Sequence, residues 1–383
     1  MFLKNTIQFF KYPDVSAVGF LFSTSSMMIG IWAAALPFVI KRLGLSDADL
    51  GLILLLAPVG SITGVIFSSQ IFGKIKINNW LGFGNLAQVI LLTIEVTAPY
   101  LWVFGLALFF RGLLGFLNST ANNLVVPKLE KEHGRRFMST CHALYSIGGV
   151  ISAGVAAIFF SFGVSSSIQI ITMAVVLSVI ILYLRKFYLK HDYFIHSGSG
   201  YRLPNKTIIG LSFICLVMFM AEGSVIDWSS IYLKRELMAP LSLISIGYGG
   251  FSVAMTLGRL NGDIYIPRLG DKKIIVGGTL LAAIGFLMVS FSPSPAFAIA
   301  GFILVGMGCC WIVPVLFAAA SRIPDVSAVQ GFGMITSGGL IGFVVGPSII
   351  GFISEQFNLS IGILFVAVML LLACFAGWRN KFL

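Results

Sequence analysis

Long runs of apolar residues, separated by short polar segments, make up most of the chain. Each run holds about 20 residues or more, the length of α-helix that crosses ~30 Å of hydrocarbon at ~1.5 Å per residue. The pattern therefore predicts twelve transmembrane helices. Their expected ranges are 15–40, 49–72, 79–98, 100–123, 138–161, 165–187, 207–233, 241–263, 274–292, 295–321, 329–353 and 359–379.

The longest polar segment lies between the sixth and seventh predicted helices and contains Ser197-Gly198-Ser199-Gly200. It divides the chain into an N-terminal six-helix bundle (1–187), a linker (188–206) and a C-terminal six-helix bundle (207–383). The halves repeat, because Gly30 through Arg42 aligns with Gly223 through Arg235. Parallel repeats of this kind are typical of secondary transporters whose binding site lies near the membrane midplane.

Composition supports an all-α integral membrane protein. Of the 383 residues, 58% are hydrophobic and 10% are charged, whereas soluble proteins carry about 25% charged residues. The net charge of +11 could indicate nucleic-acid binding, but the basic residues occupy short loops and form no stripe interleaved with aromatic residues. We therefore expect a lipid bilayer, and no nucleic acid, around this chain.

The distribution of basic residues predicts the orientation in the membrane. Of the 25 Lys and Arg, 20 fall in the termini and the predicted loops on one side, and four fall on the other. By the positive-inside rule both termini are cytoplasmic. We expect a monomeric, multi-pass protein of the bacterial inner membrane. The five cysteines show no metal-ligand spacing, so no metal or cofactor is expected.

Two carboxylates, Glu222 and Asp227, lie inside the seventh predicted helix. Counting from Lys234 places Glu222 ~18 Å below the membrane boundary, near the midplane, and Asp227 ~10 Å below it. A charge at that depth costs several kcal/mol unless it faces protein or water and finds a partner. A hydrogen-bonded acid that joins two helices is one interpretation, and a binding or proton site is the one we favour.

The fourth predicted helix carries a single basic residue near the midplane, Arg111. Asn118 and Asn122 recur with it on one face of the helix. This pattern indicates the wall of a water-filled cavity, with the two amides as candidate substrate ligands. The alternative is a polar seam in which the amides bond across to a neighbouring helix.

The buried charges suggest a division of roles. A carboxylate buried without a partner can take up and release a proton near neutral pH. We predict that Glu222 is the proton carrier, that Arg111 pairs with it when it is deprotonated, and that Asp227 helps to bind substrate or to close the outer gate. Glu95, near the outer end of the third predicted helix, is expected to extend to the membrane interface and is left out of this pairing.

Three tryptophans fall inside predicted helices rather than at the membrane interface, where tryptophan is usually enriched. They are Trp32, Trp228 and Trp311, in the first, seventh and tenth helices. An aromatic lining of the substrate cavity is one interpretation, and ordinary packing is the other.

A glycine-rich charged segment follows the eighth predicted helix. It contains Gly258, Arg259, Gly262, Asp263 and Arg268. An acid at a helix end can bind the N-terminus of a neighbouring helix and release it when a gate opens. We predict that Asp263 contacts the start of the fifth helix when the inner side is closed, whereas the alternative is a solvated charge cluster.

These motifs resemble those of the major facilitator superfamily, over nearly the whole chain. The segment from Gly258 to Arg268 resembles the family's loop motif, and Arg111-x-x-x-Gly115 resembles its fourth-helix motif, whose arginine is linked with proton coupling. The segment from Gly342 to Gly351 resembles the motif of drug antiporters, although it lies in the eleventh helix rather than the fifth. Glu222 through Ser229 and Trp32 through Pro37 resemble a bacterial branch near the fucose permeases and the rhizopine-locus permease.

The resemblance implies a permease that alternates access around a central cavity. The favoured function is proton-coupled uptake of a small polar solute, such as a sugar-like compound or metabolite. Proton-antiport efflux, a channel and a non-transporting receptor remain open. A membrane enzyme is not expected, because the chain has no His–carboxylate cluster, Gly-x-Ser-x-Gly or His-Glu-x-x-His motif, and an ATP-driven pump is not expected without a phosphate-binding loop.

Overall fold

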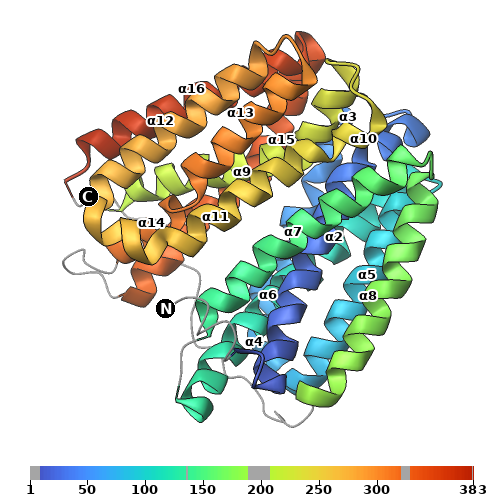
Figure 1. The fold of residues 1–383 in the computed structure, drawn as a ribbon, viewed down its shortest axis with the longest axis vertical. Helices are drawn as coiled ribbons and strands as arrows, with labels where there is room; N and C mark the ends of the chain where they lie inside the picture. The colour runs from blue at the N-terminus through green and yellow to red at the C-terminus, as the bar shows by residue number, and fades with distance from the viewer. Residues whose placement is uncertain (1–8, 135–136, 189–207, 321–327, 382) are drawn as a thin grey trace. The chain divides into compact units, whose positions relative to one another are not determined.

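The computed structural model describes residues 9–134, 137–188, 208–320, 328–381 and 383. Within these ranges every regular element is an α-helix (Figure 1). Twelve helical segments of the described residues are long and apolar enough to cross a membrane. The prediction of an all-α protein with twelve transmembrane helices is therefore confirmed.

The helices of the first half form six spans, of which the second is broken into two helices. They are α2 (Pro13–Leu43), α3 (Asp47–Leu54), α4 (Leu56–Phe72), α5 (Ile77–Thr97), α6 (Leu101–His133), α7 (Met138–Ser161) and α8 (Ser166–Tyr188).

The second half repeats this arrangement, with breaks in its second and fourth spans. Its helices are α9 (Ile209–Arg235), α10 (Leu241–Ile244), α11 (Ile246–Leu269), α12 (Asp271–Ser290), α13 (Pro295–Cys309), α14 (Ile312–Ala320), α15 (Ala328–Gln356) and α16 (Leu359–Arg379).

Several helix ends follow directly from the local sequence. The side chains of Ser294 and Asn358 accept hydrogen bonds from the backbone at the starts of α13 and α16, which satisfies donors that the first turn leaves free. Gly134, with φ of 64°, ends α6 in the left-handed conformation that glycine adopts without strain.

The helices form two compact units. Unit 1 contains α2 and α4 to α8, and unit 2 contains α3 and α9 to α16. Residues 44–55, which include α3, pack with unit 2 although they belong to the first half of the sequence. The predicted bundle boundaries stay a prediction. The predicted linker, 188–206, lies almost wholly outside the described residues.

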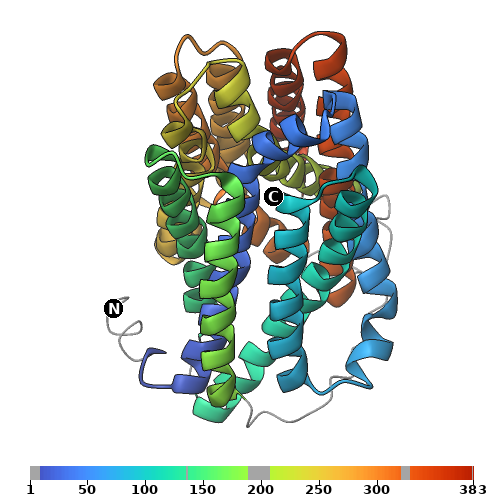
Figure 2. The ribbon, with the colours of Figure 1, turned by 90° about the vertical axis from the view of Figure 1, so that its right-hand side faces the viewer.

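Small residues bring the helices of each unit close together, as is usual where lipid provides no hydrophobic force between helices. A Cβ atom on Gly60 of α4 would overlap the carbonyl of Phe109 on α6. In unit 2, a Cβ on Gly285 of α12 and one on Gly301 of α13 would each lie 2.7 Å from the carbonyl of the other glycine. Within each unit the long helices consequently run side by side (Figures 1 and 2).

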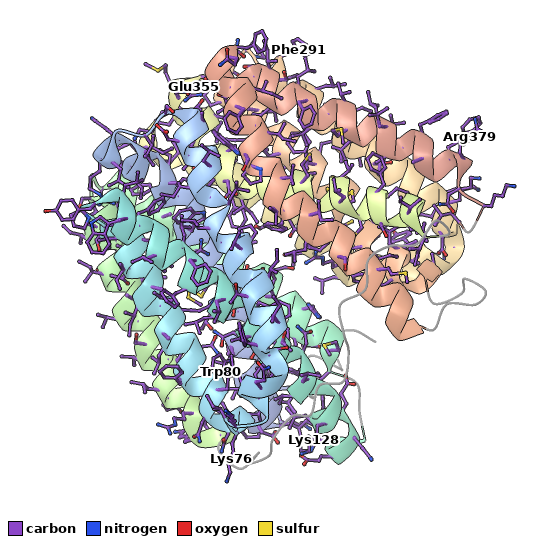
Figure 3. The ribbon with its side chains drawn as sticks, turned by 180° about the vertical axis from the view of Figure 1, so that it is seen from behind. Lys76, Trp80, Lys128, Phe291, Glu355 and Arg379 are labelled. Carbon is purple, nitrogen blue, oxygen red and sulfur yellow. The ribbon has the colours of Figure 1, made fainter. Side chains whose placement is uncertain are left out.

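The two ends of each unit differ. Lys76, Trp80 and Lys128 lie at one end of unit 1, which we call the basic end (Figure 3). In unit 2, Phe291 and Glu355 lie at one end and Arg379 at the other (Figure 3). The basic end corresponds to the predicted cytoplasmic side, and this orientation stays a prediction.

Candidate functional site

A buried ion pair joins α5 and α6 in unit 1. The Nε atom of Arg111 donates to both carboxylate oxygens of Glu95, at 2.7 Å. The Glu95 side chain is completely buried, and that of Arg111 is 20% exposed. The guanidinium lies over the ring of Trp32 from α2, with Cζ 4.9 Å from the ring centroid, and Trp32 stacks on Phe104. Three helices thus hold one charge pair against an aromatic ring.

The prediction that Glu95 extends to the membrane interface is wrong. Its carboxylate is 0% exposed and takes Arg111 as its partner. Counting residues gives the depth of a side chain in the membrane, but depth does not show which helix lies beside it. The predicted contact between Arg111 and Glu222 joins two units and stays a prediction, although unit 1 already supplies Arg111 with a carboxylate.

In unit 2, Glu222 and Asp227 lie on α9 in different environments. Asp227 is 8% exposed and has a partner. Glu222 is partly exposed, and in the part of the chain that the structure describes it has no hydrogen bond or ion pair of its own. The charge that acts on it across space is Arg259 of α11. The structure therefore brings a residue of the predicted gate motif within the electrostatic reach of the predicted proton carrier.

The other two predicted tryptophans have contrasting partners. Trp228 on α9 is completely buried, and its Nε1 has no hydrogen-bond partner among the described residues. Trp311, between α13 and α14, donates through Nε1 to the carbonyl of Gly258 at 2.6 Å and stacks on Tyr265 of α11. Trp311 thus ties the tenth span to the gate motif.

The glycines of the gate motif allow Cys310 and Trp311 to lie close to the backbone of α11. A Cβ on Gly258 would overlap Cys310, and one on Gly262 would lie 3.4 Å from the Trp311 ring. Arg268 is exposed near the end of α11. The side chain of Asp263 lies outside the described residues, so its predicted contact with the start of the fifth span stays a prediction.

Asn118 and Asn122 lie one turn apart on α6 and are 1% and 2% exposed. The carboxamide of Asn118 packs directly on Gly84 of α5, where a Cβ would overlap its Oδ1. In the structure, Asn118 therefore lies in a polar seam between two helices of unit 1, the alternative to a cavity wall. A contact of either amide with substrate stays a prediction.

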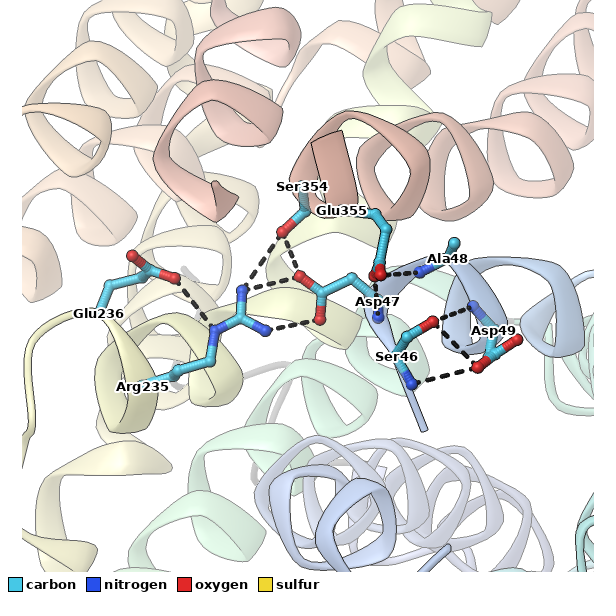
Figure 4. A network of polar contacts seen from close by, with 8 residues as sticks. All are labelled: Ser46, Asp47, Ala48, Asp49, Arg235, Glu236, Ser354 and Glu355. Atoms are coloured by element: carbon cyan, nitrogen blue, oxygen red, sulfur yellow. Dashed lines mark hydrogen bonds and ion pairs between the residues drawn. The ribbon is translucent and has the colours of Figure 1, made fainter. Parts of the chain in front are cut away.

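A polar network that no sequence motif indicated surrounds the start of α3. Nη1 and Nη2 of Arg235 donate to the Asp47 carboxylate at 2.6 and 2.8 Å. The hydroxyl of Ser354 donates to the same carboxylate. The Glu355 carboxylate accepts from the backbone N–H groups of Asp47 and Ala48, at 3.0 and 3.3 Å (Figure 4). An anion at this position also complements the helix dipole of α3.

Close packing reinforces this network. The Ser348 hydroxyl of α15 donates to the carbonyl of Gly51 at 2.7 Å, and a Cβ on Gly351 would overlap the carbonyl of Asp47. One signal could have found α3 from sequence, since Ser46 and Asp49 form a capping box that begins a helix there. Its docking on α15 had no such local signal.

A further cluster joins α2 to the end of α6. Ligand atoms of Asp14, Glu132 and His133 all lie within 4.8 Å of one another. The His133 Nε2 and Asp14 Oδ2 atoms are 3.0 Å apart, and the His133 ring packs on Tyr12. These residue types could bind a transition metal, but the direct His133–Asp14 contact also accounts for the arrangement.

Solved structures with this architecture are membrane transporters. The nucleoside transporter NupG superposes with a TM-score of 0.70 at 13% identity, covering 94% of this chain and 98% of NupG. A D-xylose-proton symporter superposes with a TM-score of 0.70 at 13% identity, covering 96% of this chain and 98% of the symporter. At these identities the likeness establishes the fold alone.

Sequence relatives give the family. The model of the Major Facilitator Superfamily matches residues 208–381. Membrane protein MosC of Rhizobium meliloti is 28% identical over 375 residues, 95% of this chain and 89% of MosC. An uncharacterized MFS-type transporter of Yersinia pestis is 34% identical over 357 residues, 91% of each chain. The chain therefore belongs to the Major Facilitator Superfamily of multi-pass membrane transporters.

Proposed function

We propose that the protein is a proton-coupled secondary transporter that takes up a small polar solute by alternating access between its two units. The observation that carries this proposal is the carboxylate of Glu222 in a transmembrane helix, which has no ion pair among the described residues, whereas Arg111 of unit 1 already has Glu95 as its counter-charge. Ionisable groups inside membrane spans are costly and usually mark substrate or proton pathways.

Glu222 links the proton to the conformational change. A charged carboxylate without a partner resists enclosure in apolar surroundings, whereas the protonated acid does not. Protonation therefore lowers the free energy of the state in which the cavity is closed to both sides. The positive charge of Arg259 acts on Glu222 and favours release of the proton once that state reopens.

Buried polar atoms without hydrogen-bond partners, on the two residues that follow Asp227, support a polar solute as the substrate. Trp228 Nε1 and Ser229 Oγ are buried and have no hydrogen-bond partner among the described residues. A hydroxyl-bearing solute could supply both an acceptor and a donor. The structural neighbours named as a nucleoside transporter and a D-xylose-proton symporter handle solutes of this general kind, and we extend that class to this chain.

α3 provides a gate for the alternating cycle. It is held in unit 2 by Asp47, Arg235 and Glu355, while α4, which follows after a single residue, packs in unit 1. Movement of one unit against the other must therefore bend the chain at Leu55 or release α3 from α15. Either event changes access at that end of the protein.

The proposal is tested in liposomes with the purified full chain, using D-xylose and uridine as first probes. We expect an inward proton gradient to drive accumulation of a transported probe, and labelled probe to exchange with unlabelled probe without a gradient. Glu222→Gln, which mimics the protonated acid, should abolish accumulation but retain exchange. Glu132→Gln, which changes an exposed acid at the end of α6, serves as the control and should retain both.

Accumulation by Glu222→Gln at the wild-type rate would show that the proton is carried elsewhere, with Asp227 as the next candidate. If neither probe is exchanged, a thermal-shift screen against hydroxylated metabolites replaces them. A chain that binds such a solute with no exchange in either direction would be a receptor, and the transport proposal would be wrong.

Proton-antiport efflux is a second candidate, favoured by the glycine and proline motif from Gly342 to Gly351. In the structure, however, a Cβ on Gly342 would overlap the carbonyl of Leu216, and one on Gly351 would overlap that of Asp47. The motif thus has a role in packing α15 on α9 and α3. An outward proton gradient that accelerates probe entry would favour antiport, whereas acceleration by an inward gradient favours symport.

A further inference from the structure

Buried polar side chains are concentrated on α5 and α6 in unit 1, and we call this set the α5–α6 seam. Its members are Trp80, Asn85 and Gln88 from α5, and Asn118 and Asn122 from α6. The contacts of Gly84 and Gly115 place three of them, Trp80, Gln88 and Asn118, at the interface of the two helices. Each side chain is at most 8% exposed. Such a concentration of amides inside a transmembrane helix pair is unusual, because every polar atom there must find a partner without help from lipid.

Trp80 and Asn118 are close neighbours within the seam. The position that a Cβ would occupy on Gly84 lies 3.1 Å from Trp80 Nε1 and overlaps the Asn118 carboxamide. Gly84 therefore leaves the space that Asn118 fills, and it places the indole N–H and the amide of Asn118 in one small region. Trp80 itself lies near the end of the unit (Figure 3).

At its other end the seam reaches the ion pair. Gln88 Nε2 lies 2.8 Å from the position of a Cβ on Gly115 and donates to the carbonyl of Arg111 at 3.3 Å. Arg111 in turn binds Glu95. Polar groups thus follow one another from Trp80 to Glu95 along a single helix interface.

Most of these polar atoms are not satisfied by protein. Trp80 Nε1, Asn85 Oδ1, Asn122 Oδ1 and both carboxamide atoms of Asn118 have no hydrogen-bond partner among the described residues. A buried donor or acceptor without a partner bears the full cost of desolvation. Five such atoms in one seam therefore require partners other than side chains, and buried water is the group that proteins use for this purpose.

We propose that the α5–α6 seam binds a row of ordered water molecules from Trp80 to Arg111, and that protons reach Glu95 along this row. The proton role rests on the proposed function, whereas water binding does not. A proton that arrives at Glu95 forms an O–H bond on one carboxylate oxygen and replaces the hydrogen bond that Arg111 donates to that oxygen.

The charges around Glu95 decide when it accepts a proton. Arg111 faces it from α6, and Arg42 of α2 donates to the carbonyl of the next residue, Val96. α2 also contributes the uncharged ring of Trp32 over Arg111. The α8 residues that line a groove against this half of α5 are all uncharged. Because Arg111 Nε binds both carboxylate oxygens, a proton can bond to Glu95 only when Arg111 turns away, so proton transfer is coupled to the movement of Arg111.

Water binding is tested by X-ray radiolytic hydroxyl-radical labelling of the purified full chain. Bound water beside an indole yields oxidised tryptophan even where bulk solvent has no access. We expect Trp80, only 3% exposed, to be oxidised at a rate comparable to that of Trp102, which is 67% exposed. Asn118→Leu, which keeps the side-chain volume and removes both polar atoms, should lower the oxidation of Trp80 several-fold.

The matched control is Gln169→Leu. Gln169 on α8 is also completely buried, and neither of its amide atoms has a partner among the described residues, but it is outside the α5–α6 seam. This variant should leave Trp80 oxidation unchanged. A wild-type Trp80 that is not oxidised above the level of other buried tryptophans would overturn the proposal without any variant having to fold.

The proton role is tested in liposomes. Asn118→Leu and Asn122→Leu should lower proton-driven accumulation of the transported probe by about 10²-fold, the lower end of the range for loss of a positioned proton-transfer group. Exchange without a gradient should be retained, and Gln169→Leu should retain both activities. Unchanged accumulation in both asparagine variants would overturn the proton route. If the wild type exchanges the probe but a proton gradient drives no accumulation, the proposed proton coupling is wrong. The radiolysis result still decides whether the seam binds water.

Discussion

At the scale of single residues, the structure shows which charged residues of the transmembrane helices pair with each other. Glu95, rather than Glu222, is the carboxylate that neutralises Arg111 within its own unit, and Trp32 covers the guanidinium. The pair is therefore one neutral element of unit 1. Glu222, by contrast, has no ion pair among the described residues.

Because Glu95 is paired with Arg111, we predict that neutralising Glu95 and neutralising Glu222 have different effects on stability. Glu95→Gln leaves a largely buried guanidinium without its counter-charge, which should destabilise unit 1 by about 3 kcal/mol, the lower end of the range for breaking a buried pair because Arg111 is 20% exposed. Glu222→Gln removes an acid that has no ion pair and should leave the melting temperature unchanged or raised. Thermal melting of the detergent-purified variants checks this.

The double variant Glu95→Gln with Arg111→Met is the internal control, because it removes both charges together. It should recover most of the lost stability, since replacing a whole buried pair is often nearly neutral. If Glu95→Gln melts like the wild type, the pair does not hold α5 to α6.

At the scale of helices, no local sequence pattern predicts that α3 packs in unit 2. It is eight residues long, too short to be a stable helix alone in water, and it owes its order to unit 2. Arg235, Ser354 and Glu355 bind its first turn, and Ser348 binds its second.

Loss of the Asp47 charge should release α3. Leu50, 0% exposed on α3, is replaced by cysteine as a reporter that a maleimide reaches only when α3 leaves its site. Asp47→Asn removes the partner of Arg235 and should raise the labelling rate several-fold. Asp49→Asn is the matched control, because the Asp49 side chain bonds only to Ser46 in the described network. Equal labelling in the two variants would contradict a role for the ion pair.

Glycine substitutions separate close packing from helix propensity. Gly351→Ala places a methyl group against the Asp47 carbonyl, where the backbone cannot move aside, and should displace α3 and lower the melting temperature. Gly277→Ala on α12 places its methyl group in open space and should be neutral or stabilising by up to about 1 kcal/mol, from helix propensity. A Gly351→Ala variant as stable as Gly277→Ala would show that the contact adjusts freely.

At the scale of the whole molecule, the distribution of basic residues still predicts which side faces the cytoplasm. The basic end of unit 1 should be inside, and the end of unit 2 with Phe291 and Glu355 should be outside. Cysteine introduced at Lys74 should react with a membrane-impermeant maleimide only in broken cells, and cysteine introduced at Phe291, 70% exposed, should react in intact cells. The five native cysteines are first replaced by alanine to provide a background without labelling. Reversed labelling of the two sites would invert the predicted topology.

Much of the fold was predictable because the length of an apolar run is a local quantity. A run of about 20 apolar residues can satisfy its backbone in lipid only as a helix, so the twelve spans follow from the chain alone. Helix ends with strong local signals, such as those at Ser294 and Asn358, are local in the same sense. The depths of Arg111, Glu222 and Asp227 in the membrane stay predictions from counting residues.

The sequence by itself thus determined the number of spans, the family and the residues that carry charge inside the membrane. Only the tertiary structure decided that Glu95 pairs with Arg111, that Asn118 packs on Gly84, and that α3 belongs to unit 2. Lipid tails are as apolar as leucine, so hydrophobicity does not select which helices are neighbours. That choice depends on polar contacts and small-residue fits between positions far apart in the chain, which no local pattern contains.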